Sequence, residues 1–221
     1  MNLQKLHKEI NRLVELELKA NPVSYNKRIP YQSYDRINFK GLRWTPEKRI
    51  KEYGIINFLN EKSKILDIGS NFGFLTCELA LEAELVHGVE PNEHLNKIGE
   101  LTARYLGVEN KVKFFNEKFS DFNSKIQYDI VLSLAAFYTA DGREREDAKN
   151  YVERIHKLLH PGGVIFFEST SYDSANKGAS YVAIQSAIRT MKKLFHTLEF
   201  ATKKSGSPGW FRDYFVGRKI S

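Results

Sequence analysis

The segment Lys64-Ile-Leu-Asp-Ile-Gly-Ser-Asn-Phe-Gly73 decides how this sequence folds. Its first half is an apolar run with the length of a buried strand, and its second half is a turn that contains Gly69 and Gly73. Glycine at these positions removes side chains where a ligand has to approach the backbone. The next apolar run predicts a helix over 72–81, whose first N–H groups are free to bind a ligand.

Strands and helices alternate on the carboxyl side of this segment. Further strands are predicted over 85–90, 112–115, 129–134 and 164–168, with helices over 93–106, 146–159 and 181–194. Two more strands, 195–202 and 211–218, flank a turn rich in Gly, Ser and Pro. This alternation predicts an α/β fold with a mostly parallel sheet and helices on both faces, and a ligand at the carboxyl ends of the strands.

The first 49 residues are predicted to form an N-terminal helix and lid segment (1–49) ahead of a cofactor-binding domain (50–221). Apolar residues three and four apart predict a helix over 3–20, which either packs on its own domain or forms a homodimer through residues 3–20. Residues 22–46 are irregular and aromatic. Pro46 suits the first turn of a helix over 46–59, with Thr45 as its N-cap.

Composition and charge limit the class of protein. The chain has 221 residues, of which 42% are hydrophobic and 28% charged, as expected for one globular domain. No apolar run spans a bilayer, the charged N-terminus is unlike a secretory signal, and the single Cys77 excludes an internal disulfide, so we expect a cytoplasmic protein. Residues 1–62 and 176–221 carry net charges of +6 and +7, and 63–175 carry −6. The basic ends either are solvated surface or attract an anionic substrate.

Two acids mark the predicted ligand site. Asp67, just before the glycine turn, would repel a pyrophosphate but can engage a cationic amino group. Glu90, in Val89-Glu90-Pro91-Asn92, can accept both hydroxyls of a ribose, and it follows Asp67 by 23 residues, close to the roughly 20 expected for a ribose-binding acid. The alternative is that Glu90 is an acid at the start of a helix. The pair favours an adenosyl sulfonium over a dinucleotide.

Two later segments, together with 64–73 and 89–92, form a set of four. They are Tyr128-Asp-Ile-Val-Leu-Ser-Leu134, a strand, and Leu158-Leu-His-Pro-Gly-Gly-Val-Ile-Phe-Phe-Glu168, a helix end, a tight turn and a strand. In this order the four segments resemble the class I S-adenosylmethionine-dependent methyltransferases, over about residues 50–218. The resemblance implies a Rossmann-like seven-stranded sheet in the order 3-2-1-4-5-7-6 with strand 7 antiparallel. It also implies S-adenosyl-L-methionine as cofactor and S-adenosyl-L-homocysteine as product.

The same resemblance assigns roles to residues of this sequence. The methionine part of the cofactor would contact Asp67, Gly69, Ser70, Asn71 and Gly73, and its ribose would contact Glu90, which Pro91 follows. The loop Lys118-Phe119-Ser120 matches the adenine-binding loop, where many members have an acid in place of Lys118, so adenine contact is assigned to the backbone and to Phe119. Ser133, Leu134 and Ala135 match the floor of the pocket.

Methyl transfer from such a cofactor needs few protein groups, because the methyl is already electrophilic. Candidate bases are Tyr138, Asp141 and Glu168, with His196 as a further one, although each also has an ordinary structural interpretation. No Cys/His cluster suggests zinc and no paired acids suggest magnesium, so no metal is expected.

The segment that could contact the acceptor is Phe39-Lys-Gly-Leu-Arg-Trp-Thr-Pro-Glu-Lys-Arg49. Cations and aromatics here either close over the cofactor carboxylate or the substrate, or form a packed lid with solvated cations; the residues concerned are Tyr31, Arg43, Trp44 and Arg49. With 67–74 and 133–138, this segment is similar to the tRNA wobble-uridine carboxy-S-adenosylmethionine branch, whose large N-terminal region this sequence lacks.

We therefore expect a methyltransferase acting on an O (or N) atom of a small-molecule or glycan-type acceptor, for which an anionic or phosphorylated compound suits the basic ends. The alternative is an RNA methyltransferase of the tRNA type, suggested by aromatics among cations. Dispersed basic residues and the lack of an RNA-binding motif count against RNA. A non-enzymatic scaffold is disfavoured, because the set Asp67, Gly69, Gly73 and Glu90 is intact.

Overall fold

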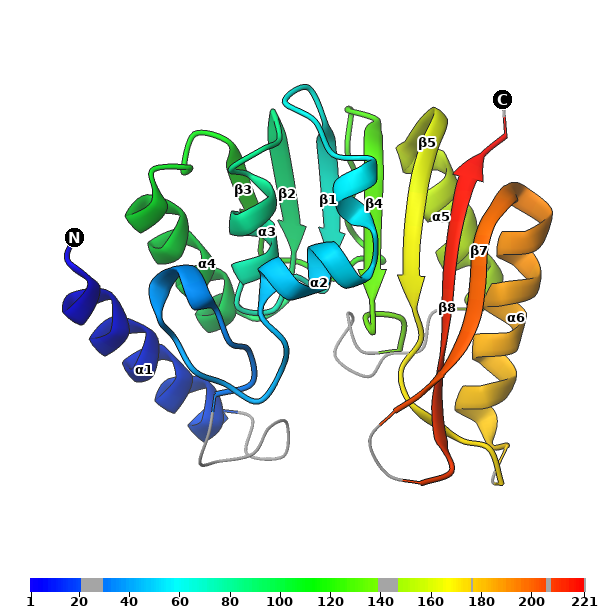
Figure 1. Cartoon of the computed structure of the whole chain (residues 1–221), viewed down its shortest axis with the longest axis horizontal. Coiled ribbons are helices and arrows are strands. Elements are labelled where there is room, and N and C mark those ends of the chain that lie inside the picture. Colours follow the sequence, from blue (N-terminus) through cyan, green and yellow to red (C-terminus); the bar gives the residue numbers. More distant parts are fainter. Residues whose placement is uncertain (21–29, 139–146, 176, 206–207, 221) are drawn as a thin grey trace. The chain divides into compact units, whose positions relative to one another are not determined.

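The computed structural model describes residues 1–20, 30–138, 147–175, 177–205 and 208–220 (Figure 1). The strands are β1 (Lys64–Ile68), β2 (Leu85–Val89), β3 (Val112–Phe115), β4 (Tyr128–Leu134), β5 (Leu159–Glu168), β6 (Tyr172–Asp173), β7 (Phe195–Lys204) and β8 (Trp210–Lys219). The helices are α1 (Leu3–Ala20), α2 (Pro46–Glu52), α3 (Phe74–Leu79), α4 (Glu93–Leu106), α5 (Ala148–Leu158) and α6 (Ala179–Leu194), with short 3-10 turns η1 (Asp35–Ile37) and η2 (Ile55–Asn57).

The strand order is β3-β2-β1-β4-β5-β8-β6, and β7 pairs with β8. Strand β8 runs antiparallel to β5, β6 and β7, whereas the pairs β2–β3, β1–β4 and β4–β5 are parallel. The predicted Rossmann-like α/β fold is therefore confirmed: the last strand of the chain is the antiparallel one and lies between β5 and β7. The two-residue strand β6 was not predicted, because a bridge this short leaves no periodic pattern.

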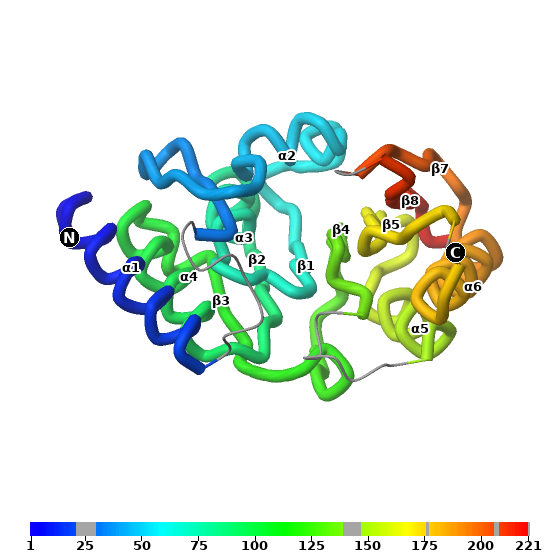
Figure 2. Tube along the Cα trace, turned by 90° about the horizontal axis from the view of Figure 1, so that it is seen from below, coloured from blue at the N-terminus to red at the C-terminus, as the bar shows by residue number. Residues whose placement is uncertain are grey.

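The chain divides into two compact units, Met1–Lys62 with Ser70–Glu117, and Ser63–Gly69 with Lys118–Ser221. In the first unit α1 lies alongside α4 (Figure 2). The apolar side chains Leu6, Ile10 and Leu13 of α1 are buried there. Helix α1 therefore buries the middle of its apolar stripe within its own chain, and a homodimer through residues 3–20 stays a prediction.

Glycines allow close packing around the ring of Phe114 in the first unit. A Cβ added at Gly73, Gly88 or Gly99 would lie 2.4–2.8 Å from atoms of this ring. Real Cβ atoms do not approach that closely, so these positions require glycine for space, and Gly73 also adopts a left-handed φ of 70°. The glycine turn and the helix α4 are thereby packed against one side chain of β3.

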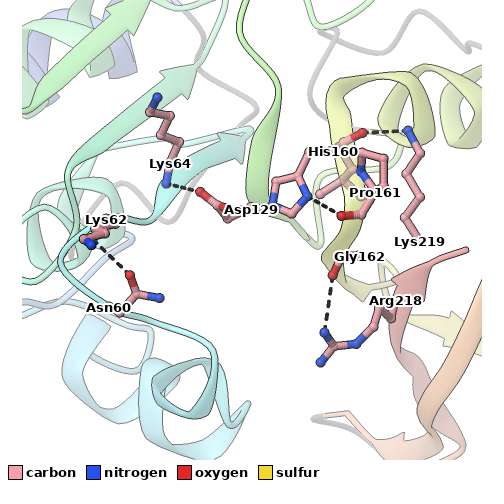
Figure 3. Close-up of polar contacts among 10 residues, drawn as sticks. Asn60, Lys62, Lys64, Asp129, His160, Pro161, Gly162, Arg218 and Lys219 are labelled. Carbon is pink, nitrogen blue, oxygen red and sulfur yellow. Dashed lines mark hydrogen bonds and ion pairs between the residues drawn. The ribbon is translucent and has the colours of Figure 1, made fainter. Parts of the chain in front are cut away.

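The second unit contains β1 and the strands that follow β3. Asp67 of β1 is in register with Leu132 of β4. At the opposite strand ends, the Asp129 carboxylate accepts from the backbone N–H of Lys64 at 2.7 Å and contacts His160 Nε2 at 2.6 Å (Figure 3). The Lys219 ammonium donates to the carbonyls of His156 and Leu159, at the end of α5. These contacts fix the starts of β1, β4 and β5. The predicted site residues of β1 and β4 lie at the opposite ends of these strands.

Several predicted boundaries differ from the structure. The helix predicted over 46–59 ends at Glu52, because Gly54 adopts a left-handed φ of 67°. The helix predicted over 72–81 begins at Phe74, after the left-handed Gly73. Thr45 is the N-cap residue of α2, but its side chain makes no capping bond. Among the described helices, none is both long and apolar enough to cross a membrane.

Candidate functional site

The turn after β1 has an unusual backbone. Gly69, Asn71 and Gly73 adopt φ values of 69°, 54° and 70°. Asparagine is one of the few residues besides glycine that tolerates the left-handed region, which explains Asn71 at this position. The Ser70 backbone N–H donates to the Val89 carbonyl at 3.2 Å, so the turn is attached to the end of β2.

The side chain of Ser70 supplies a test of whether this turn suits a polar ligand. Its Oγ is buried and has no hydrogen-bond partner among the described residues, and the same holds for Oε1 of Gln32. Buried polar atoms are nearly always hydrogen-bonded, so the unsatisfied Ser70 hydroxyl is available as a donor and acceptor for a ligand. The turn therefore fits the polar methionine part of S-adenosylmethionine.

Glu90 joins the turn to the start of α4. Its Oε2 accepts from the backbone N–H of Asn71 at 3.1 Å, and its Oε1 accepts from the backbone N–H of Asn92, also at 3.1 Å. The carboxylate is buried, with 9% of the residue exposed. Both carboxylate oxygens are thus held in place by backbone N–H groups, one from the glycine turn and one from the start of α4. Glu90 lies at the helix start, as one interpretation of the sequence expected, and its ribose role stays a prediction.

Asn92 and Glu17 are connected to Glu90 by hydrogen bonds, and the sequence analysis assigned neither of them a role. The Asn92 side chain caps α4 by accepting from the N–H groups of His94 and Leu95, at 3.0 and 3.3 Å. Its Nδ2 donates to Glu17 Oε2 of α1. The position of Glu17, four residues after Leu13 on the buried stripe of α1, is a signal that could have identified it.

The second unit holds Asp67, Gly69 and the predicted adenine loop. Asp67 is 4% exposed. The ring of Phe119 is fully buried, with its centroid 5.1 Å from that of Tyr151 on α5. The hydroxyl of Ser133 is 2.8 Å from that of Tyr151. Ser133 and Phe119 therefore direct their side chains to α5, and any contact they make with a cofactor would come from their backbone.

The candidate bases lie in different surroundings. Tyr138 is strained, with a φ of 77°, and its hydroxyl reaches the Ala179 carbonyl at 3.4 Å. Glu168 accepts from Arg212 Nη1 at 2.8 Å in a mostly buried ion pair. His196 is exposed on β7. Asp141 lies outside the described residues. Strained backbone clusters at functional sites, so Tyr138 is the better-supported candidate.

The predicted lid segment belongs to the first unit and is anchored by a buried cluster of hydrogen bonds. The hydroxyl of Tyr34 donates to Glu78 Oε2 at 2.6 Å, and Arg36 binds both oxygens of Glu78, at 2.7 and 2.8 Å. Burial, followed by the bond to Glu78, raises the pKa of the Tyr34 phenol far above its usual value. The rings of Tyr34 and Phe39 also pack on Phe74, the first residue of α3. The lid segment is thereby attached to the helix that follows the turn.

Three cations of the lid lie over aromatic rings. Arg43 is 5.3 Å from the ring centroid of Tyr31, Lys48 is 4.3 Å from that of Trp44, and Arg49 is 5.8 Å from that of Tyr53. Trp44 is 53% exposed. Both sequence interpretations of this segment stay open, since stacking organises the cations while leaving the surface accessible.

Comparison with known proteins agrees with this geometry. Residues 66–165 match a family model described as a methyltransferase domain. The chain is 31% identical over 153 residues to the carboxy-S-adenosyl-L-methionine synthase of Nautilia profundicola, covering 67% of this chain and 62% of the relative. It is 24% identical over 149 residues to the ubiquinone biosynthesis O-methyltransferase of Escherichia coli, covering 66% and 59%. The chain thus spans about three fifths of the length of these curated relatives.

A solved structure extends the similarity to the fold. The N-methyltransferase NodS from Bradyrhizobium japonicum WM9, in complex with S-adenosyl-L-homocysteine, superimposes with a TM-score of 0.62 at 13% identity, over 79% of this chain and 85% of the other. With the strand order and the matched segments, these similarities support a class I S-adenosylmethionine-dependent methyltransferase.

Proposed function

We propose that this chain transfers a methyl group from S-adenosylmethionine to an O (or N) atom of a small-molecule or glycan-type acceptor that carries negative charge. The observation that supports the cofactor part most directly is Glu90, whose two oxygens are oriented by the N–H groups of Asn71 and Asn92. A carboxylate held by fixed backbone donors is preorganised for a diol, so little entropy is lost when ribose binds.

The residues of this chain then have defined tasks. The bound cofactor supplies an electrophilic methyl on its sulfonium. Glu90 binds the ribose, Asp67 attracts the amino group, and Ser70 and Asn71 bind the methionine part. Where the acceptor has to lose a proton, Tyr138 is the candidate base, and it takes up that proton as a phenolate, becoming a neutral phenol. The stacked cations Arg43 and Arg49 bind the negative charge of the acceptor.

The cofactor assignment is tested by calorimetric titration of S-adenosylhomocysteine. We expect Glu90→Ala to weaken binding by about 1–3 kcal/mol, as expected for the loss of a charged hydrogen bond. Glu93→Ala is the matched control, because Glu93 is an exposed acid on the first turn of the same helix. Unchanged affinity in Glu90→Ala would reject the ribose assignment.

The acceptor class is tested by a tritiated-methyl assay on a metabolite extract and an RNA extract. We expect counts in the metabolite fraction, reduced in Arg43→Ala and retained in the control Lys192→Ala, a cation of α6. Counts confined to RNA, with an affinity that falls steeply with salt, would instead establish the RNA alternative. No incorporation into either extract, by an enzyme that binds the cofactor, would contradict the proposed acceptor.

A further inference from the structure

Helix α1 buries a carboxylate among its apolar residues. Leu6, Ile10, Leu13 and Glu17 form its buried stripe, and Glu17 is only 3% exposed. A buried carboxylate is costly unless hydrogen bonds satisfy it. An alanine or leucine at this position would pack on α4 without that cost, so packing alone does not explain the acid.

The contact of Glu17 leads to the ribose-binding acid in two steps. Glu17 Oε2 accepts from Asn92 Nδ2, and the backbone N–H of Asn92 donates to Glu90 Oε1 at 3.1 Å. Glu90 Oε2 in turn accepts from the backbone N–H of Asn71, in the glycine turn. A continuous series of hydrogen bonds thus runs from α1 to the turn, and every member lies in the first unit.

The chemistry of the Asn92 amide explains what an acid at position 17 contributes. An amide can rotate to exchange its oxygen and its NH₂ group. A carboxylate only accepts, so Glu17 retains the NH₂ group on its own side and leaves Oδ1 facing the N–H groups of His94 and Leu95. This orientation fixes the N-cap of α4. It thereby also fixes the direction of the Asn92 backbone N–H, from which Glu90 accepts a hydrogen bond.

We propose that Glu17 is a positioning residue for Glu90, and that α1 is therefore part of the cofactor-binding machinery. The proposal rests on the ribose role of Glu90 given above. The consequence is that affinity for the adenosyl cofactor depends on a residue of α1 that precedes Glu90 by 73 residues in the sequence.

The test is a double-mutant cycle on the full chain, read as the dissociation constant for S-adenosylhomocysteine. We expect Glu17→Leu, which retains the apolar packing, to raise this constant about five- to tenfold, equivalent to roughly 1 kcal/mol or slightly more. Glu17→Gln retains an acceptor for Asn92 and should stay within about twofold, while Glu15→Leu, on the exposed side of α1, is the matched control.

Measuring Glu17→Leu both alone and together with Glu90→Ala distinguishes failure of this proposal from failure of the ribose assignment. In a Glu90→Ala background, Glu17→Leu should have no further effect on binding, because its effect passes through Glu90. An equal loss in both backgrounds, or a fall in thermal stability with unchanged affinity, would overturn the proposal and leave Glu17 a purely structural residue. Unchanged binding by Glu90→Ala alone would instead reject the proposed ribose site. If Glu17→Leu does not fold, Asn92→Asp replaces it, since aspartate still caps α4 but cannot donate to Glu17.

Discussion

Glu78 in the first unit and Asp213 in the second are both buried carboxylates that join distant segments, but their donors differ. Glu78 is bound by the guanidinium of Arg36 and the hydroxyl of Tyr34. Asp213 accepts from neutral groups: the hydroxyls of Tyr172 and Thr202 at 2.9 and 2.7 Å, and the amide of Gln185 at 2.8 Å.

The difference separates two ways of stabilising a buried acid. The Glu78 cluster depends on charge, and half of its cation is in solvent, since the Arg36 side chain is 46% exposed. The Asp213 cluster depends on geometry, because its donors converge on a residue that is 1% exposed. Removing the charge should therefore lower the free energy of unfolding more at Glu78. Removing the whole side chain should lower it more at Asp213.

Truncation should give the largest effect. Asp213→Ala leaves three donors without their acceptor and should lower the free energy of unfolding by about 3–5 kcal/mol. Glu78→Ala should cost less, about 2–3 kcal/mol, because Arg36 can turn to water and mainly Tyr34 is left unsatisfied. Urea denaturation of the two variants gives both values. The reverse order would show that the guanidinium contact outweighs the buried hydroxyl network.

A pH experiment compares the buried His87 of the first unit with the half-buried His156 of the second. Burial, and then the charge of Lys113, lowers the pKa of His87 from 6.5 to about 4. The unfolded chain therefore takes up this proton first, so the contribution is present above pH 6.5 and is lost as the pH falls towards 4. We expect this loss to reach about 1–3 kcal/mol.

The variant His87→Gln should flatten this part of the pH profile, measured as the free energy of unfolding between pH 7 and 4.5. Burial also lowers the pKa of His156, but its side chain is only half-buried, so His156→Gln should flatten the profile less. The exposed His196→Gln is the control and should leave the profile unchanged. A profile of His87→Gln that matches the wild type would disprove the assignment.

Isosteric neutralisation of Glu78 should give a smaller loss. Glu78→Gln retains an acceptor for Tyr34 but turns an NH₂ group towards Arg36, so we expect a loss of about 1–2 kcal/mol, moderated by the exposure of Arg36. Raising the salt concentration should reduce the difference between variant and wild type. A difference that is independent of salt would indicate that the Tyr34 bond, and not the charge pair, is the sensitive contact.

The smallest effect is expected for Asp213→Asn. The asparagine carbonyl can still accept from Tyr172 and Thr202, and the Gln185 amide can rotate to present its oxygen to the new NH₂ group, so the change should stay below about 1 kcal/mol. Thermal unfolding measures it. A loss comparable to that of Asp213→Ala would mean that the negative charge itself is required.

Residues that are adjacent in the sequence made the site predictable in outline. The left-handed turn at Gly69, Asn71 and Gly73 and the acid at Glu90 all follow strand ends, so local pattern was enough to find them. The alternation of strands and helices predicted a mostly parallel sheet, and the resemblance to the methyltransferase family implied its strand order. The roles of the individual residues in binding stay predictions that the variants above examine.

Side-chain direction and long-range pairing were not predictable. Ser133 and Phe119 fall in the matched segments, but both face Tyr151 of α5, which a motif cannot reveal. Glu168, one of the candidate bases, accepts a hydrogen bond from Arg212, 44 residues later in the sequence. Such pairs leave no signal in a single sequence, because either member alone resembles an ordinary surface charge.

The sequence by itself determined the strand–turn–helix unit at 64–79, the acid 23 residues beyond Asp67 and the α/β fold, because hydrophobic period and glycine placement act over a few residues. Only the tertiary structure decided which acids are partnered and by what. Glu17, Glu78 and Asp213 each bind donors from other segments of the chain, and the energy of a buried carboxylate depends on those donors and on its exclusion from water.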